Sequence, residues 1–306
     1  MTTIQFQLRQ ATHSDLPAIA ALISEGLSFD GLTIVQTAEE LEEDWGGPYC
    51  FLDQDVVVAE HESHIIGVGY TYFLPSETKE ERCYALGTVK PAYRRKGVGT
   101  ELQQWTTTRA EKLLRSTNRT IPKFLRSDVS TSNTSADFLF KKFNMRPVRW
   151  NEDLIIDLNQ SPEVFVSPGY CVIPWDTSRD EEARVVKNLA FMDHWGSTPT
   201  SEEGWEQLVH GSTAKLDQSF FALDSSNNNI VGLLLSHRYE SDDETLGKRI
   251  GWIDKLATLS EHRGKSIGRS LITHALAAYR RDGLTHAALD VDTENPTGAY
   301  GLYTAV

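Results

Sequence analysis

The stretch WIDKLATLSEHRGKSIGRSL, residues 252–271, begins with the short apolar pattern of a buried strand. A glycine-containing segment, Arg-Gly-Lys-Ser-Ile-Gly at 263–268, follows it. Beyond this segment, apolar side chains recur with the i, i+3, i+4, i+7 spacing of one buried helical face, at Ile272, Ala275, Leu276 and Tyr279. The stretch therefore predicts a strand, a short loop and a helix in immediate succession.

The start of the predicted helix has the properties of an anion-binding site. The backbone N–H groups of a first helical turn have no helical partner, and the macrodipole adds partial positive charge there. Small residues let these N–H groups approach a phosphate closely, and Arg263 and Lys265 add positive charge. We therefore expect residues 263–268, the second anion loop, to bind a diphosphate.

The same pattern occurs upstream, in ALGTVKPAYRRKGVGTEL at 85–102. Its segment Arg-Arg-Lys-Gly-Val-Gly, residues 94–99, is the first anion loop. A single R-x-x-G-x-G would be weak evidence for any function. Arg94 and Arg263 are 169 residues apart, however, as are Gly99 and Gly268. Two copies in one register, each between a strand and a helix, indicate an internal duplication.

Two other phosphate-binding motifs fit these loops less well. A P-loop needs a glycine five residues before Gly264, and the chain has Leu259 there. The dinucleotide fingerprint G-x-G-x-x-G is absent from both loops.

Both loops resemble the acetyl-CoA loop of the GNAT (Gcn5-related) N-acetyltransferases, whose pattern is Q/R-x-x-G-x-G/A. The tandem arrangement is similar to the mycothiol synthase-like two-domain members of that family. The resemblance implies an α/β fold of two tandem GNAT domains, each a mixed central β-sheet flanked by helices. It places an N-terminal domain at 1–159 and a C-terminal domain at 168–306. It also implies acetyl-CoA as the acetyl donor.

The predicted elements follow the order of such domains in both halves. In the first half we expect strands at 6–11, 56–59, 65–73, 84–89 and 123–129, helices at 16–27 and 136–143, and closing strands within 146–158. Residues 159–168, with two prolines and two serines, form the expected linker. In the second half we expect strands at 170–174, 220–223, 230–237, 250–258 and 287–291, and a helix at 181–191. A GNAT domain normally continues beyond the Leu-Tyr motif with a final strand, so the second half resembles a truncated copy.

The composition limits the possible partners. The 306 residues allow two domains, and 40% hydrophobic with 24% charged residues is ordinary for a globular protein. The formal charge of −13 argues against nucleic acid or an anionic membrane as a partner. The same charge is compatible with a cationic amine as substrate, with the protein acting as a monomer or homodimer.

The cysteines and the N-terminal sequence indicate the cellular compartment. Cys50, Cys83 and Cys171 are odd in number and far apart, which favours a reducing compartment over a disulfide framework. The first residues lack the apolar core of a signal peptide, and no run approaches the roughly 18 apolar residues of a membrane span. The nine histidines form no spaced cluster that would bind a metal. We therefore expect a cytoplasmic protein without a metal.

The resemblance implies cofactor-binding residues in both halves, on the strand before each loop, in the loop and at an asparagine further on. In the second half these are Leu256, Ala257, Thr258, Arg263, Gly264, Lys265, Ser266, Ile267, Gly268, Arg269 and Asn295. In the first half they are Gly87, Thr88, Val89, Arg94, Arg95, Lys96, Gly97, Val98, Gly99, Thr100 and Asn133. Ser266 stands where the pattern has glycine, and it either crowds the phosphate or binds it through its hydroxyl.

The same resemblance assigns a general acid. In GNAT enzymes a tyrosine near the CoA sulfur protonates the departing thiolate, and Tyr303 occupies that motif position. A phenol, with a pKa of about 10, is a suitable proton donor to a thiolate. Phe140 stands at the matching position of the first half and cannot donate a proton. We therefore expect catalysis in the second half and a catalytically degenerate first half; the alternative is that Tyr303 is a core tyrosine.

Two further residues are assigned to the acceptor. Asp254, on the strand before the second loop, is the proposed general base, and the alternative is a surface carboxylate. His194 lies where the acceptor site is usually covered and is proposed to bind substrate or serve as base, the alternative being a packed or surface histidine. The expected acceptor is a primary amine of a small molecule. Two other functions stay open: a non-catalytic acyl-CoA-binding or sensing module, favoured by Phe140 and Ser266, and a protein N-acetyltransferase with a partner subunit.

Overall fold

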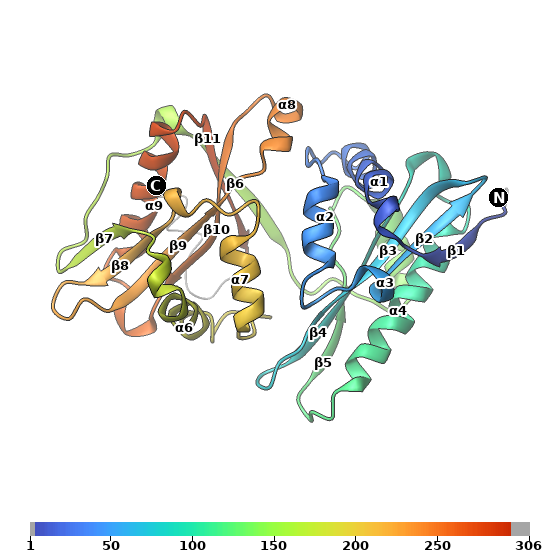
Figure 1. The fold of residues 1–306 in the computed structure, drawn as a ribbon, viewed down its shortest axis with the longest axis horizontal. Helices are drawn as coiled ribbons and strands as arrows, with labels where there is room; N and C mark the ends of the chain where they lie inside the picture. The colour runs from blue at the N-terminus through green and yellow to red at the C-terminus, as the bar shows by residue number, and fades with distance from the viewer. Residues whose placement is uncertain (1–3, 295–306) are drawn as a thin grey trace. The chain divides into compact units, whose positions relative to one another are not determined.

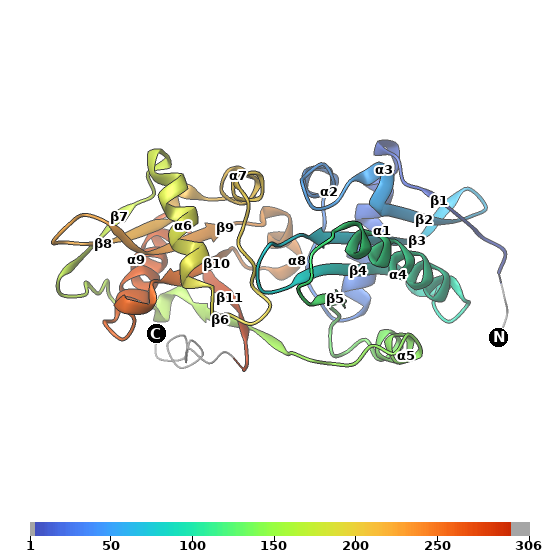
Figure 2. The ribbon, with the colours of Figure 1, turned by 90° about the horizontal axis from the view of Figure 1, so that it is seen from below.

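The computed structural model describes residues 4–294, and the chain divides into two compact units (Figures 1 and 2). Unit 1 is Met1–Arg146 and unit 2 is Pro147–Val306. Each unit contains one mixed β-sheet with helices on both of its faces. This confirms the predicted α/β class with two tandem domains.

The sheet of unit 1 has five strands in sequence order. They are β1 (Gln7–Gln10), β2 (Val56–His61), β3 (His64–Leu74), β4 (Glu81–Val89) and β5 (Lys123–Arg126). Neighbouring strands are antiparallel except for β4 and β5, which are parallel. The helices are α1 (Leu16–Phe29), α2 (Ala38–Trp45), α3 (Leu52–Asp55), α4 (Val98–Ser116) and α5 (Thr134–Lys142).

The two faces of this sheet are buried by different helices. Val58 and Val68 pack with residues of α1 and α2, including Ile19. Val57, which precedes Val58 on β2, packs instead with Leu102 of α4. Successive strand side chains point to opposite faces, so one apolar strand supplies both cores.

The sheet of unit 2 has six strands in the order β6-β11-β10-β9-β8-β7. They are β6 (Asn151–Asp157), β7 (Tyr170–Pro174), β8 (Phe220–Asp224), β9 (Ile230–His237), β10 (Ile250–Thr258) and β11 (His286–Asp292). The helices are α6 (Asp180–Ala190), α7 (Glu202–His210), α8 (Asp243–Leu246) and α9 (Ile267–Arg281). Strands β10 and β11 are parallel, and the other neighbouring pairs are antiparallel.

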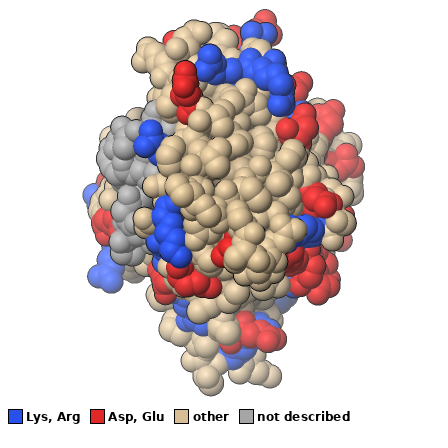
Figure 3. All heavy atoms as spheres, turned by 90° about the vertical axis from the view of Figure 1, so that its left-hand side faces the viewer, with Lys and Arg blue, Asp and Glu red and all other residues tan. Residues whose placement is uncertain are grey.

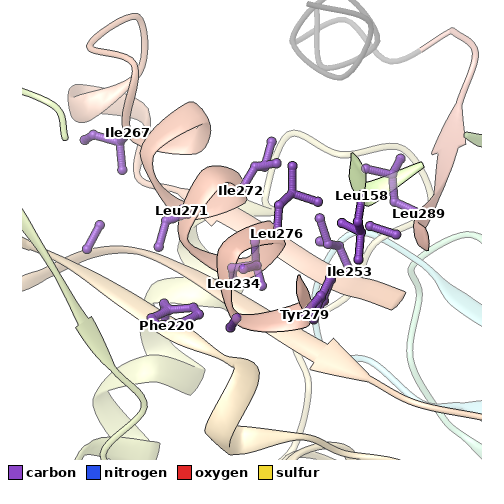
Figure 4. Packing of buried hydrophobic residues seen from close by; sticks show 14 of the residues in the cluster. Leu158, Phe220, Leu234, Ile253, Ile267, Leu271, Ile272, Leu276, Tyr279 and Leu289 are labelled. Carbon is purple, nitrogen blue, oxygen red and sulfur yellow. The ribbon is translucent and has the colours of Figure 1, made fainter. Parts of the chain in front are cut away.

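Helix α9 buries the face that its sequence periodicity predicted (Figure 4). Leu276 and Tyr279 pack against strand residues such as Leu234. The fully buried Tyr279 hydroxyl donates a hydrogen bond to Ser236 Oγ at 2.7 Å. A Cβ atom on Gly251 would lie only 2.7 Å from the Tyr279 ring, so β10 needs glycine at this point. Helices α6 and α7 cover the opposite face of the sheet.

One predicted strand belongs to the other unit. We predicted that residues 146–158 close the first domain, but β6 pairs antiparallel with β11, from Asn151 opposite Asp292 to Asp157 opposite His286. Without β6, β11 would be an edge strand with unpaired backbone groups. Leu154 and Ile156 of β6 also pack against the core beneath α9. The structural boundary therefore falls after Arg146 rather than at 159.

On the face seen in Figure 3, charged side chains are spread out and do not form a single patch. That face of unit 2 has a broad uncharged centre, with acidic and basic residues interspersed around it. Within residues 4–294, no helix combines the length and the apolar character that crossing a membrane requires.

Candidate active site

The two anion loops share one backbone conformation. Each connects the end of a strand to the start of a helix, β4 to α4 and β10 to α9. The second and fourth positions of both loops are left-handed: Arg95 and Gly97 have φ of 61° and 95°, and Gly264 and Ser266 have φ of 73° and 60°. Such alternation turns successive N–H groups toward one side, as in the concave backbone sites that bind anions. The duplication predicted from the sequence therefore extends to the backbone.

These loops leave a row of backbone donors without partners. Among the described residues, nothing accepts a hydrogen bond from the N–H groups of 95–99 or 264–269. Helical bonding begins only afterwards, where Thr100 donates to Gly97 O at 3.0 Å and Ser270 donates to Ser266 O at 3.0 Å. Unpaired N–H groups at a helix N-terminus are what a diphosphate needs, so the backbone fits the predicted ligand.

The first arginine of each loop is occupied by protein groups. Arg94 donates from Nη1 and Nη2 to the Asp30 carboxylate, at 2.5 and 3.0 Å, and from Nε to Val89 O at 3.0 Å. Arg263 donates from Nη2 to Ala190 O at 2.7 Å and from Nε to Thr258 O at 3.3 Å. Each arginine thus connects its strand to the end of α1 or α6. We predicted that Arg263 and Lys265 add charge for the phosphate. The guanidinium of Arg263, like that of Arg94, is bonded to protein groups, and the role of Lys265 stays a prediction.

The side chain of Asn133 is also hydrogen-bonded within unit 1. Its Oδ1 accepts a hydrogen bond from Ala136 N at 3.0 Å, which caps α5. Its Nδ2 donates to Asp30 Oδ2 at 2.7 Å. Both ends of the amide are therefore engaged within unit 1, in the network that holds Arg94. The matching Asn295 lies outside the described residues, and so does Tyr303.

The strand before each loop separates from its parallel neighbour. Pairing of β4 with β5 ends at Tyr84 opposite Arg126, and pairing of β10 with β11 ends at Trp252 opposite Ala288. The predicted pantetheine-binding residues lie beyond these points: Gly87, Thr88 and Val89 on β4, and Leu256, Ala257 and Thr258 on β10. Each segment still pairs with the strand on its other side. A gap between diverging strands exposes the backbone groups of that edge to a ligand.

Only unit 2 has an irregularity in this strand. On β10, Ile253 pairs with Ser236 and Lys255 pairs with Leu235, so Asp254 is an extra residue between two regular pairs. Strands β3 and β4 pair without a break from Gly67 opposite Val89 to Leu74 opposite Arg82. A β-bulge bends its strand and redirects a side chain. Asp254 therefore has no counterpart in unit 1.

Asp254 is surrounded by cationic side chains. Lys255 Nζ lies 2.8 Å from its Oδ2, and the carboxyl keeps about a quarter of its side-chain surface exposed (26%). Burial raises the pKa of Asp254, but Lys255, His237 and Lys187 together outweigh this effect and lower it. A carboxylate with a lowered pKa is a poor proton acceptor at neutral pH. In this structure it holds the ammonium group of Lys255.

The residues near Asp254 come from the face covered by α6 and α7. His237 is buried, with Nε2 3.2 Å from Leu208 O and Nδ1 3.1 Å from Thr213 Oγ1. Lys187 is buried on α6, with Nζ 2.5 Å from Thr200 Oγ1. Neither was singled out in the sequence, because their proximity depends on the sheet register and on helix packing.

His194 lies in the turn after α6 and is half-buried. Its Nδ1 is 3.0 Å from Trp195 O, and its ring centroid is 5.4 Å from that of Phe191. This is the end of α6 to which Arg263 is bound through Ala190. A role for His194 in substrate binding stays a prediction.

Sequence reasoning missed a repeated aspartate beside each strand gap. Asp128 and Asp290 each stand two residues after the last pairing of β5 with β4 and of β11 with β10. Both are exposed. The signal was present as D-V-x-x-x-N, which leads from Asp128 to Asn133 and from Asp290 to Asn295. In the described part of the chain, no group of histidine, cysteine, aspartate and glutamate side chains is arranged to hold a metal.

Solved structures share this fold over most of the chain. A GCN5-related N-acetyltransferase from Sphaerobacter thermophilus superposes with a TM-score of 0.74 and 25% identity, over 99% of this chain and 92% of that one. A tandem GNAT protein from the clavulanic acid biosynthesis pathway has a TM-score of 0.69 and 14% identity, over 98% and 94%. The glucosamine N-acetyltransferase region of a fungal multi-domain GH3 β-N-acetylglucosaminidase gives 0.68 and 18%, over 94% of this chain and 35% of that protein.

None of the curated proteins compared with the chain matches it. The model of the acetyltransferase (GNAT) family matches twice, at residues 26–145 and 188–305. Each match contains one anion loop, and together they cover more than half of the chain. With its two strand–loop–helix sites and two mixed sheets, the chain belongs to the acetyltransferase (GNAT) family, as a tandem member of this class of acyltransferases.

Proposed function

We propose that unit 2 transfers the acetyl group of acetyl-CoA to a primary amine of a small molecule, and that unit 1 does not turn over. The observation that carries this proposal is the β10 bulge, which adds Asp254 to unit 2 at the gap between diverging strands. The unpaired N–H groups of residues 264–269 fit the diphosphate of the donor.

The proposed chemistry needs few groups. The neutral amine nitrogen attacks the acetyl carbonyl and then loses a proton to water, the C–S bond breaks, and the departing thiolate gains a proton. Tyr303 is the proposed donor of that proton, and Phe140 cannot serve in unit 1. Asp254 holds the incoming ammonium ion as its counter-ion before water takes the ammonium proton, and orientation supplies much of the acceleration. This replaces the general-base role assigned to Asp254 from the sequence, because its pKa is lowered.

The proposal is tested by measuring release of free CoA from acetyl-CoA with a panel of amines. The panel contains aliphatic diamines, amino acids and glucosamine, the last because one structural relative carries a glucosamine N-acetyltransferase region. We expect turnover with at least one amine, and a lower kcat/KM for that amine when Asp254 is changed to Asn. Binding of acetyl-CoA without turnover on any amine would favour a sensing module. Turnover only on a peptide N-terminus would favour a protein N-acetyltransferase.

A further inference from the structure

The chain between β6 and β7, whose residues were predicted to form a linker, lies against helix α9 and belongs to unit 2 (Figure 1). Phe165 N donates a hydrogen bond to Thr273 Oγ1 at 3.0 Å, and Ser270 Oγ donates to Phe165 O at 2.8 Å. Both of these partners on α9 are buried. We call residues 165–167 the strap.

The strap also reaches the second anion loop. Ser167, with only 1% of its surface exposed, donates a hydrogen bond from Oγ to Lys265 O at 2.5 Å. Its backbone N–H donates to Ser270 Oγ at 3.3 Å. A serine hydroxyl has one proton to donate, and here that proton is used on a backbone carbonyl of the loop. Ser167 therefore connects α9 to the loop that precedes it.

This hydrogen bond constrains the peptide group between Lys265 and Ser266. A trans peptide is planar, so its C=O and its N–H point in opposite directions. Because Lys265 O is held toward the strap, the N–H of Ser266 is directed away from the strap, and it is one of the unpaired donors of the loop. Ser266 also has a φ of 60°, which is unfavourable for a residue with a side chain. A fixed carbonyl just before it helps to hold this conformation.

Unit 1 differs at the matching positions. With the 169-residue offset between the loops, α4 has Glu101 and Gln104 where α9 has Ser270 and Thr273. The first two side chains are exposed, whereas the two on α9 are buried. In the part of the chain that the structure describes, nothing donates a hydrogen bond to the carbonyl of Lys96, the counterpart of Lys265. We therefore treat the contact between strap and loop as a feature of unit 2.

We propose that Ser167 is a positioning residue for the acetyl donor in unit 2. Its hydroxyl fixes the peptide between Lys265 and Ser266 so that the N–H is available to the diphosphate. This inference rests on the proposed function, because it needs the second anion loop to bind the donor. A loop that is already fixed in its binding conformation loses less freedom when the ligand binds, which increases affinity. Ser167 thus acts on donor affinity and takes no part in the transfer step.

The test is hydrogen exchange of the full chain at increasing concentrations of CoA, read separately for residues 264–269 and 95–99. The midpoint of protection in each segment measures the CoA affinity of its own unit. Ser167→Ala should raise the midpoint at 264–269 about fivefold, as the loss of one ordinary hydrogen bond predicts, and leave that at 95–99 unchanged. In the CoA-release assay, KM for acetyl-CoA should rise by the same factor, with kcat and KM for the amine unchanged.

Thr273→Val is the matched control, because it removes a hydrogen bond between the strap and α9 that does not involve the loop. It should lower Tm, as Ser167→Ala does, but leave both midpoints unchanged. An unchanged midpoint in Ser167→Ala, an equal shift in Thr273→Val, or no protection of 264–269 by CoA in the wild type would overturn the inference. Protection of 264–269 in a wild-type chain that acetylates no amine counts against the proposed transfer alone, since the effect of Ser167 on CoA affinity is still measured.

Discussion

The two units have the same loop conformation but different side chains beside it. In both, an arginine connects the strand end to a helix end, and a loop with two left-handed residues directs unpaired N–H groups to one side. In unit 2 a bulge adds Asp254 among cationic neighbours; in unit 1 the matching strand β4 is regular and carries one tyrosine, Tyr84. The duplicated feature is thus the loop that fits a diphosphate, whereas the side chains on the preceding strand differ.

The largest expected effect concerns the tail tyrosine. Tyr303→Phe should lower kcat by about 10²–10⁴-fold, the usual contribution of a general acid, and leave acetyl-CoA affinity nearly unchanged because the ring remains. Steady-state kinetics and calorimetry measure the two quantities. Tyr300→Phe, on the same tail, is the matched control and should retain activity. If Tyr303→Phe keeps the full kcat, the difference between Tyr303 and Phe140 no longer supports placing catalysis in unit 2.

A second variant tests the bulge. Asp254→Asn keeps the shape of the side chain and removes its charge, so we expect kcat/KM for the amine to fall about 10–100-fold, mostly through KM, as expected for a lost charge-assisted contact. Glu244→Gln removes an exposed carboxylate of the short helix α8, outside the β10 bulge, and should have no effect. If Asp254→Asn lowers kcat and leaves KM unchanged, the carboxylate acts in the chemical step. That result would support the general-base role predicted for Asp254 from the sequence.

The first anion loop offers a matched pair of glycines. Gly97 has φ of 95°, so Gly97→Ala should destabilise unit 1 by about 1–2 kcal/mol and weaken its acetyl-CoA binding. Gly99 is helical, and an added Cβ would lie 3.6 Å from Leu139, an ordinary contact. Gly99→Ala should therefore be tolerated, as the G/A of the family pattern implies. If the two variants have the same Tm in thermal unfolding and the same acetyl-CoA affinity in calorimetry, the left-handed conformation of Gly97 is contradicted.

Acid should weaken strand β4 of unit 1. Glu81 is fully buried in unit 1, and although burial raises its pKa, Thr117, Arg119 and Lys123 outweigh this and lower it. A lowered folded-state pKa gives stability that is present above the unfolded value of about 4.3 and is lost as the pH falls through the folded value. Hydrogen exchange at decreasing pH should show β4 losing protection as the pH falls through the folded-state pKa of Glu81. Glu81→Gln should make the protection of β4 less dependent on pH, and an unchanged pH profile in this variant would contradict the prediction.

The smallest effect belongs to Ser266. It adopts φ of 60° where the first loop has glycine. Ser266→Gly relieves the left-handed conformation but adds freedom to the unfolded chain, so we expect a net gain of only about 0.5 kcal/mol in unit 2. Chemical denaturation measures the gain, and calorimetry shows whether acetyl-CoA binds more tightly. Weaker binding would mean that the hydroxyl contacts the diphosphate.

Local patterns predicted most of the fold and the backbone part of the site. The strands at 170–174 and 250–258 and the buried face of α9 were visible in the sequence, because alternation and helical periodicity are local properties. The short helices α2, α3, α7 and α8 were missed, since they carry only a turn or two of weak periodicity. Strand β6 was identified, but its partner was not, because pairing between distant strands leaves no local signal.

Side-chain roles were harder to predict. The arginines of the loops appeared to be phosphate ligands, and their carboxylate and carbonyl partners on α1 and α6 became visible only in three dimensions. His237 and Lys187 contact the surroundings of Asp254 from other elements, so no spacing in the sequence links them. Asp128 and Asp290 are the exception, since their repeated spacing to an asparagine was available.

The placement of β6 has a consequence for synthesis on the ribosome. Leu154 pairs with Leu289, so β6 leaves the ribosome about 135 residues before its partner strand. At roughly 5–20 residues per second, this strand waits on the order of ten seconds with its backbone unpaired. Unit 1 needs nothing from β6 and can fold meanwhile, whereas the sheet of unit 2 closes last, by a long-range contact that slows folding. A nascent chain should therefore be most exposed to chaperones and to aggregation during this interval.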